Sequence, residues 1–414
     1  MPSSLSMRVT ILVLLLFIAF PGRAGSEPAR DSLSGRVRVL YIGDCFGVRS
    51  RPYVYMTREP LFVVTPIPSS TGRVRVEEEV RKLMRLYMPR SYREHVEEHD
   101  LVILSAMERF YYTSLQLAWF KKGVLEEGHG IMMVGGYHTF GGKPPSPSWS
   151  GSGVEDVLPV QILEAQVHDT GGYPFHPVPV DPEHPFCTSL DWSGVRPFYG
   201  MNVVKTKQPA VEVLRPDRFV SDPLLVYWEV GKGSGIAHTP DWAPGWGEDF
   251  MDWAYFPDYV DNLLYFLARL EVPQDLDLIH AVRATLHGQR MELGVIQSMS
   301  NFVESFGGNS GPIQREMSRI GNMEREAYLL YADQDYQAVM SKMSEIEVGR
   351  LRVRAIELKN RTLVWVFAIE WLAVTGTFLA GSFAIWSLMV RRRLYHEVRA
   401  TRLGMYGRES PPKT

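Results

Sequence analysis

The sequence has little cysteine and little net charge, and both shortages exclude classes of function. Cys45 and Cys187 are the only cysteines among 414 residues, and neither belongs to a CxxC pair. A zinc site made of cysteines and a disulfide-rich scaffold are therefore excluded, and a disulfide between these two would require an extracytoplasmic compartment. The formal net charge of −3 gives no electrostatic reason to expect nucleic-acid binding. No nucleic-acid partner is predicted.

Long apolar runs occur at two places. The first, Val9–Phe20, follows Arg8 and is followed by small residues up to Ser26. About a dozen apolar residues in this setting are typical of a secretory signal peptide, which we assign to residues 1–26. An uncleaved N-terminal anchor is the alternative.

The second run, Leu363–Val390, is long enough to cross a bilayer, which needs about 20 apolar residues. Arg391–Arg393 follow at once, and this places the tail, residues 391–414, in the cytoplasm and the N-terminal domain outside. Glu370 lies inside the span, where it is either tolerated near the outer headgroups or marks a contact with another helix. The predicted partners are the lipid bilayer and a protein bound through the stalk or the transmembrane helix.

Apolar strands alternate with amphipathic helices over residues 36–273, which predicts an α/β domain with right-handed crossovers and a parallel sheet. The predicted strands are 36–43, 61–67, 100–106, 130–134, 160–168, 210–214, 224–230 and 235–239. The last two are predicted to form a hairpin, and helices are predicted over 76–87, 113–125 and 259–270.

Residues 274–362 have helical spacing and predict a bundle or stalk of three helices. Their predicted ranges are 276–306, 312–333 and 336–361, and the last helix is expected to continue into the membrane span.

The stretch GIMMVGGYHTFGG, residues 130–142, is expected to position the site. Ile131–Val134 predict a strand buried on both faces, Gly135 and Gly136 break it, and Tyr137 and His138 follow at the turn. Ligands and catalytic groups of open α/β sheets lie at the carboxyl ends of such strands.

Several segments together resemble class I glutamine amidotransferase-like domains: VLYIGD (39–44), DLVILSA (100–106), the 130–142 stretch, VEDVLPVQIL (154–163), DPLLVYWEVGK (222–232) and IAHTPDWAPGWG (236–247). The resemblance spans residues 36–271 and implies a flavodoxin-like fold. Active members place a cysteine at the strand-to-helix elbow, activated by a histidine that an acid orients. In this sequence the elbow holds Tyr137, the base position holds Thr239, and the acid, Asp241, is retained. The resemblance therefore implies no glutaminase activity of the usual kind.

Other groups could supply catalysis at the same edge. Cys45 follows the first strand and His138 follows the elbow, so a relocated Cys45–His138 pair with Asp241 is the enzymatic alternative. A buried, inert Cys45 and a merely satisfied His138 are the competing interpretation. His238 and Asp241 lack a third ligand, and neither a metal nor a cofactor is predicted.

The leading hypothesis is a membrane-anchored, extracytoplasmic module that binds a small ligand or a protein. The predicted ligand-binding residues are Asp44, Gly135, Gly136, Tyr137, His138, Asp241, Trp242 and Trp246. Aromatic faces beside carboxylates suit sugars or cationic groups, although the tryptophans could simply pack the top of the domain. The alternatives are a hydrolase or amidase using Cys45, His138 and Asp241, and a structural subunit of a membrane assembly.

Overall fold

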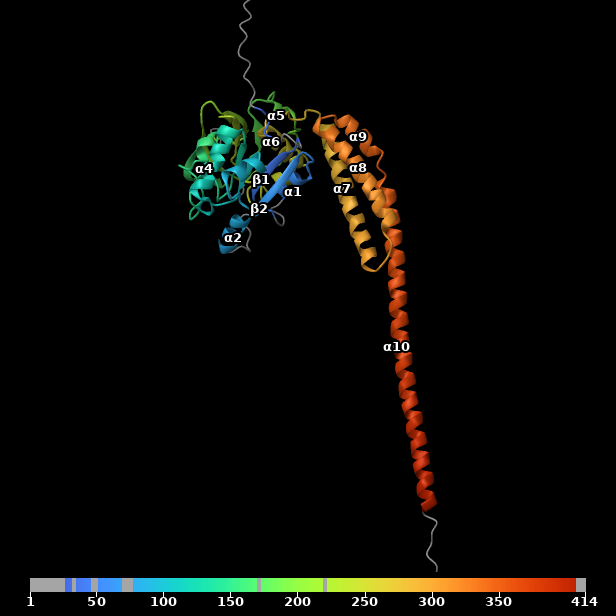
Figure 1. The fold of residues 1–414 in the computed structure, drawn as a ribbon. Coiled ribbons are helices and arrows are strands. Elements are labelled where there is room, and N and C mark those ends of the chain that lie inside the picture. Colours follow the sequence, from blue (N-terminus) through green and yellow to red (C-terminus); the bar gives the residue numbers. More distant parts are fainter. Residues whose placement is uncertain are drawn as a thin grey trace, which may run out of the picture. The chain divides into compact units, whose positions relative to one another are not determined.

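The computed structural model describes residues 27–31, 35–45, 51–68, 77–169, 173–218 and 222–406, and the predicted signal peptide lies outside these ranges. The chain divides into two compact units (Figure 1). The first comprises residues 1–281 with 330–336, and the second comprises 282–329 with 337–414.

The first unit contains an eight-stranded sheet of order β2-β1-β3-β4-β10-β9-β8-β6. The strands are β1 (Val37–Gly43), β2 (Phe62–Pro68), β3 (Leu101–Ser105), β4 (Gly130–Val134), β6 (Pro177–Pro179), β8 (Val211–Pro216), β9 (Leu225–Val230) and β10 (Gly233–His238). The first five in the sheet order run parallel, which confirms the predicted α/β core, and their order is that of flavodoxin-like sheets.

The prediction of a parallel sheet is wrong for the other half. β9, β8 and β6 run antiparallel, so the sheet is mixed. The cause is local, because the short turn at Gly231–Lys232 can join only antiparallel neighbours, whereas parallel strands need a crossover. This turn is the predicted hairpin, which the structure confirms.

Strands of the parallel half are buried on both faces. Val39 and Tyr41 belong to one apolar core, and the alternating Leu40 and Ile42 belong to the other. Helices cover both faces: α1 (Arg51–Arg58) and α6 (Phe256–Leu267) contribute to the first core, and α2 (Glu77–Tyr87) and α4 (Ser114–Lys122) to the second. Strand register pairs Ile42 with Leu104, Ser105 with Val134 and Val134 with His238, so the carboxyl ends of β1, β3, β4 and β10 form one edge.

Two further strands and two short helices belong to the first unit. β5 (Val160–Asp169), a predicted strand, leaves the main sheet and pairs antiparallel with β7 (Gly200–Thr206) in a two-stranded sheet. α3 (Tyr92–Glu98) begins at the Ser91 cap, and α5 (Pro185–Thr188) is a single turn. The strands β6 and β7 and the helices α1, α3 and α5 were not predicted.

The second unit is helical. It is built from α7 (Leu276–Ser305), α8 (Gly311–Ala332), α9 (Tyr336–Ser344) and α10 (Val348–Tyr406), of which the first residues of α7 and the last of α8 belong to the first unit. The single third helix that we predicted is wrong, because residues 345–347 interrupt it. Ile346 and Val348 are both buried, whereas a continuous helix would place them about 200° apart.

α10 continues from the bundle into the predicted span without a break, as expected. In the described part of the chain it contains the one candidate membrane span, by length and composition only. Its apolar side chains from Val364 onward are exposed, and so is Glu370. A protein partner at Glu370 stays a prediction.

Candidate functional site at the carboxyl edge of the sheet

Two glycines bring β4 and β10 together at this edge. The Gly135 amide donates to the His238 carbonyl at 2.7 Å and to the Pro240 carbonyl at 3.0 Å. A Cβ at Gly135 would lie 1.8 Å from the Thr239 carbonyl oxygen, so no other residue fits there. Gly136 has a φ of +136°, a conformation that glycine adopts without strain.

Asn202 on β7 fixes the backbone of this turn. Its side-chain oxygen accepts from the Gly136 amide at 2.8 Å, and its side-chain nitrogen donates to the Gly136 carbonyl at 3.1 Å. The Asn202 amide also donates to the Thr239 carbonyl at 3.0 Å. Asn202 is fully buried, and it therefore holds the ends of β4 and β10 from a third element.

The turn after β4 differs from a nucleophile elbow. Such an elbow strains the nucleophilic residue itself and leads directly into a helix. Here the left-handed backbone belongs to Gly136 and not to Tyr137, and residues 137–153 form turns and loop. The corner thus lacks a following helix N-terminus that would stabilise an anion.

Tyr137, at the nucleophile position, is partly exposed. The edge of its ring meets Trp246 with centroids 5.0 Å apart, and the Lys143 ammonium lies 4.3 Å from its ring centroid. Tyr137 therefore presents an aromatic surface that already contacts a cationic group.

The late-strand position holds no usable base. Thr239 is fully buried, and its hydroxyl donates to the Pro223 carbonyl at 2.8 Å. His238 is buried as well, with Nδ1 3.0 Å from the Pro240 carbonyl oxygen and its ring against Phe198. Burial lowers the pKa of His238 to about 4, so this ring is neutral at pH 7.

Asp44 and Cys45, which follow β1, and Asp241, from a distant segment, all act electrostatically on the buried phenol of Tyr41. Burial raises the pKa of Tyr41 well above its usual value, and Cys45, Asp44 and, more weakly, Asp241 raise it further. Tyr41 is therefore a neutral O–H donor. Ser105, at the end of β3, hydrogen-bonds to it.

Asp241 lies beside the turn, and Cys45 lies at the end of β1. One Asp241 carboxylate oxygen accepts from the Ala243 amide at 3.0 Å, and the other lies 3.8 Å from where a Cβ at Gly136 would be. The Cys45 thiol lies 3.3 Å from the Gly43 carbonyl. Both cysteines are buried free thiols, and burial raises the pKa of Cys187 to about 12.

His138 belongs to a network that the sequence analysis missed. Its Nδ1 lies 2.9 Å from the Glu108 carboxylate and 2.8 Å from the Ser146 hydroxyl, and Ser146 donates to the same Glu108 oxygen at 2.8 Å. This geometry places His138 with Glu108 and Ser146 rather than with Cys45. Glu108 stands three residues beyond β3, so the strand-end argument used for Cys45 could have found it.

This network is not a serine hydrolase triad. A triad places the serine and the acid on opposite ring nitrogens, whereas here both contact Nδ1. With Nδ1–H directed to Glu108, the tautomer leaves Nε2 as the basic nitrogen of His138.

The three tryptophans of residues 240–258 are buried. Trp242 donates from Nε1 to Ser105 at 3.1 Å, and Trp246 packs on Gly200. Trp246 Nε1 has no hydrogen-bond partner within the described residues. Trp242 and Trp246 are thus buried near the turn after β4, and Tyr137 is the exposed aromatic side chain there.

No group of three or more His, Cys, Asp or Glu side chains within the described ranges is arranged to hold a metal ion.

Comparisons with known proteins give distant similarities. Two cytoplasmic proteins from Salmonella typhimurium share 22% and 19% identity with this chain, each with a TM-score of 0.46, over 56% of this chain and 99% of theirs. A beta-galactosidase from Bacillus circulans shares 11% identity with a TM-score of 0.31, over 52% of this chain and 31% of its own. No curated protein sequence matches this chain. The family model described as "Putative glutamine amidotransferase" matches residues 109–269, so this part of the first unit is similar to that family.

Proposed function

We propose that this chain is a single-span membrane protein whose glutamine amidotransferase-like domain lies outside the cytoplasm and binds a small polar ligand without glutaminase chemistry. The observation that supports this most strongly is the pair of residues at the two catalytic positions. Tyr137 is a phenol, which is a poor nucleophile near neutral pH, and Thr239 is buried with its hydroxyl committed to a carbonyl.

The chemistry of the edge suggests the class of ligand. Asp44 and Asp241 supply carboxylates, and Tyr137 supplies an exposed aromatic face that already accepts the Lys143 ammonium. Carboxylates beside such a face favour cationic groups or sugar hydroxyls.

The membrane part of the proposal is supported by α10. Its apolar side chains between Leu363 and Val390 are largely exposed, and Arg391–Arg393 follow. Exposed apolar surface of this length is unfavourable in water and favourable in a bilayer. The charge after the span favours a cytoplasmic tail.

Two assays on the detergent-purified full chain test the proposal. Incubation with glutamine is expected to release no ammonia above background, and release that disappears in Cys45→Ala or His138→Gln would contradict the non-catalytic assignment. A thermal-shift screen of sugars and quaternary amines is expected to find a ligand. Asp241→Asn should weaken its binding about tenfold, because a charged contact is lost. Asp156→Asn, an exposed acid paired with Lys121, is the matched control.

A hydrolase or amidase is the second candidate, and the Glu108–His138 contact of 2.9 Å favours it. A carboxylate on Nδ1 orients the ring and leaves Nε2 to take a proton from water or substrate. In this case His138→Gln would abolish turnover of any substrate found, and Cys45→Ala would separate a thiol mechanism from a water mechanism.

A further inference from the structure

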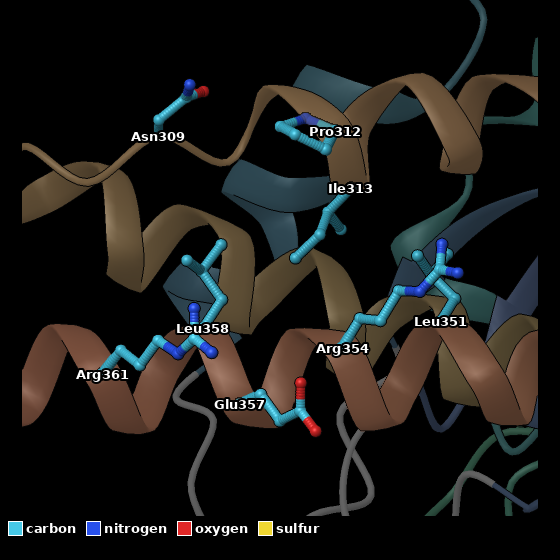
Figure 2. Close-up of a pocket in the computed structure, with 8 residues that line it drawn as sticks. All are labelled: Asn309, Pro312, Ile313, Leu351, Arg354, Glu357, Leu358 and Arg361. Carbon is cyan, nitrogen blue, oxygen red and sulfur yellow. The ribbon is translucent and has the colours of Figure 1, made fainter.

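A pocket lies within the helical unit, between the start of α8 and α10. Its volume is about 220 Å³, and Figure 2 shows Ile313 pointing from α8 toward the α10 residues below it. Leu351, Arg354, Leu358 and Arg361 line the α10 side. These four positions repeat at helical spacing, so one stripe of α10 faces the pocket.

Positive charge dominates this pocket. Arg354 and Arg361 are exposed, and neither guanidinium has a hydrogen bond or ion pair to any of the residues that the structure describes. Glu357 is the one carboxylate in the lining. The nearby Glu316 is bound by Arg319 at 2.7 Å, and the charge of Arg354 also helps to lower the pKa of Glu316.

The α8 side of the pocket is formed by Asn309, just before the helix, and by Pro312 and Ile313 in its first turn. The Gly311 amide donates to the Asn309 side chain and the Ile313 amide donates to the Ser310 carbonyl, so this helix start offers no amide to a ligand. The two guanidinium groups of Arg354 and Arg361 are therefore what favours a doubly contacted anion such as a phosphate group.

The rest of the pocket is apolar and lies next to the predicted span. Ile313 and Leu351 are buried at its base. The Thr362 hydroxyl lies 3.3 Å from where a Cβ at Gly308 would be, so the α7–α8 connection reaches the level of Thr362. Arg361 stands two residues, or about 3 Å along the helix, before the apolar run begins at Leu363. The anion site therefore adjoins the segment that would enter the lipid.

We propose that this pocket binds the phosphate of an anionic phospholipid headgroup in the leaflet that α10 enters first. This rests on the proposed membrane span. Arg354 and Arg361 contact the phosphate oxygens, and Ile313 and Leu358 contact the apolar part next to the headgroup. Arginine suits this role because its planar fork matches phosphate oxygens.

The test is lipid binding by the full chain in detergent, measured by native mass spectrometry with added phosphatidylglycerol or phosphatidylcholine. The expected result is a clear preference for phosphatidylglycerol, which the double variant Arg354→Gln/Arg361→Gln reduces about tenfold. The matched control is Arg350→Gln/Arg352→Gln, which removes the same charge from the same helix. Those two arginines contact Glu347 and Glu292 instead. An equal loss of phosphatidylglycerol binding in both double variants would show a general effect of charge and would overturn the proposed headgroup site.

Two further measurements show which part of the proposal fails, the headgroup site or the membrane span. Inorganic phosphate at millimolar concentration should not displace the lipid, and full displacement would show a site for free phosphate instead. Flotation of the full chain with phosphatidylcholine vesicles after alkaline washing tests the span alone. Retained flotation without a preference for phosphatidylglycerol overturns this site and leaves the span intact, whereas lost flotation overturns both. Far-ultraviolet circular dichroism shows whether the variants keep their helices.

Discussion

Histidines lie near both ends of strand β4, and the two ends differ in how the ring nitrogens are satisfied. At the carboxyl end, His138 is partly exposed and its Nδ1 is held by Glu108 and Ser146. At the amino end, His129 directly precedes the strand and packs against His95, with ring centroids 5.2 Å apart. The same residue type thus has a carboxylate partner at one end and an aromatic one at the other.

The amino-end cluster is completed by His99, whose ring lies 6.1 Å from that of His95. All three rings are buried, and among the described residues both nitrogens of His95 and the Nδ1 atoms of His99 and His129 have no hydrogen-bond partner. Burial lowers the pKa of His95 to about 3 and those of His99 and His129 to about 4. The carboxyl end of β4 therefore has a partly exposed ring with a carboxylate partner, while the amino end holds neutral rings by packing at a cost in stability.

The largest expected effect on the free energy of unfolding comes from adding a Cβ at a glycine, and this effect should differ between the two ends of β4. Gly135→Ala forces a Cβ to 1.8 Å from the rigid Thr239 carbonyl, and we expect the α/β unit to lose more than about 4 kcal/mol or fail to fold. Gly123→Ala, beside the amino-end cluster, places a Cβ 2.8 Å from His129 Nδ1 and 3.2 Å from His95 Nε2, both on side chains that can shift. Its expected loss is below about 2 kcal/mol, because alanine also favours the helix. Urea unfolding followed by tryptophan fluorescence measures both, and equal losses would contradict the assignment of a rigid carboxyl corner.

The position of the corner was predictable because it depends on local pattern. Uninterrupted apolar runs such as Leu101–Leu104 identify strands buried on both faces, and Gly135-Gly136 marks where β4 ends. Because each follows the carboxyl end of a strand, Asp44, Cys45 and Asp241 were expected at one edge of the sheet. In the structure all three raise the pKa of Tyr41.

The features that could not be predicted depend on contacts between segments that are far apart in the sequence. Asn202 reaches Gly136 across 66 residues from a strand that was not predicted, and Glu108 reaches His138 across 30. Neither pairing has a spacing that marks it in a single sequence. The antiparallel half of the sheet was missed for a different reason, since the predicted hairpin implied it, whereas the alternation of strands and helices favoured a parallel sheet.

Lowering the pH should reduce stability through the buried histidines at the amino end of β4. An unfolded histidine takes up its proton near pH 6.5, whereas the buried rings take theirs only near 3 to 4. The unfolded state therefore binds more protons between these values, and stability falls as the pH falls through this window. Each buried histidine should cost about 2 kcal/mol between pH 6.5 and 5, and the fully buried His238 adds to the slope.

Removing one ring isolates the contribution of the amino-end cluster. His95→Leu should lower the number of protons taken up on unfolding by about one, and should raise stability at pH 5 by about 2 kcal/mol relative to the parent chain. Urea titrations at several pH values between 4.5 and 7.5 give that number from the slope of the unfolding free energy. His176→Gln, which changes an exposed histidine paired with Asp217, is the matched control. A parent chain whose stability is flat across this range would show that the three rings are not buried as neutral groups.

The smallest effect belongs to the carboxyl-end network, where the partners are satisfied and partly exposed. Glu108→Gln weakens the acceptor shared by His138 and Ser146, and Ser146→Ala removes one donor, so each should cost about 1 kcal/mol at pH 7. Because the two side chains contact each other, the double variant should cost less than the sum of the single ones, with a coupling of about 0.5 kcal/mol or more. The same urea titration measures this cycle. Strict additivity would mean that Glu108 and Ser146 act separately on His138, and the second candidate function would then lose the preorganised acid–histidine pair on which it depends.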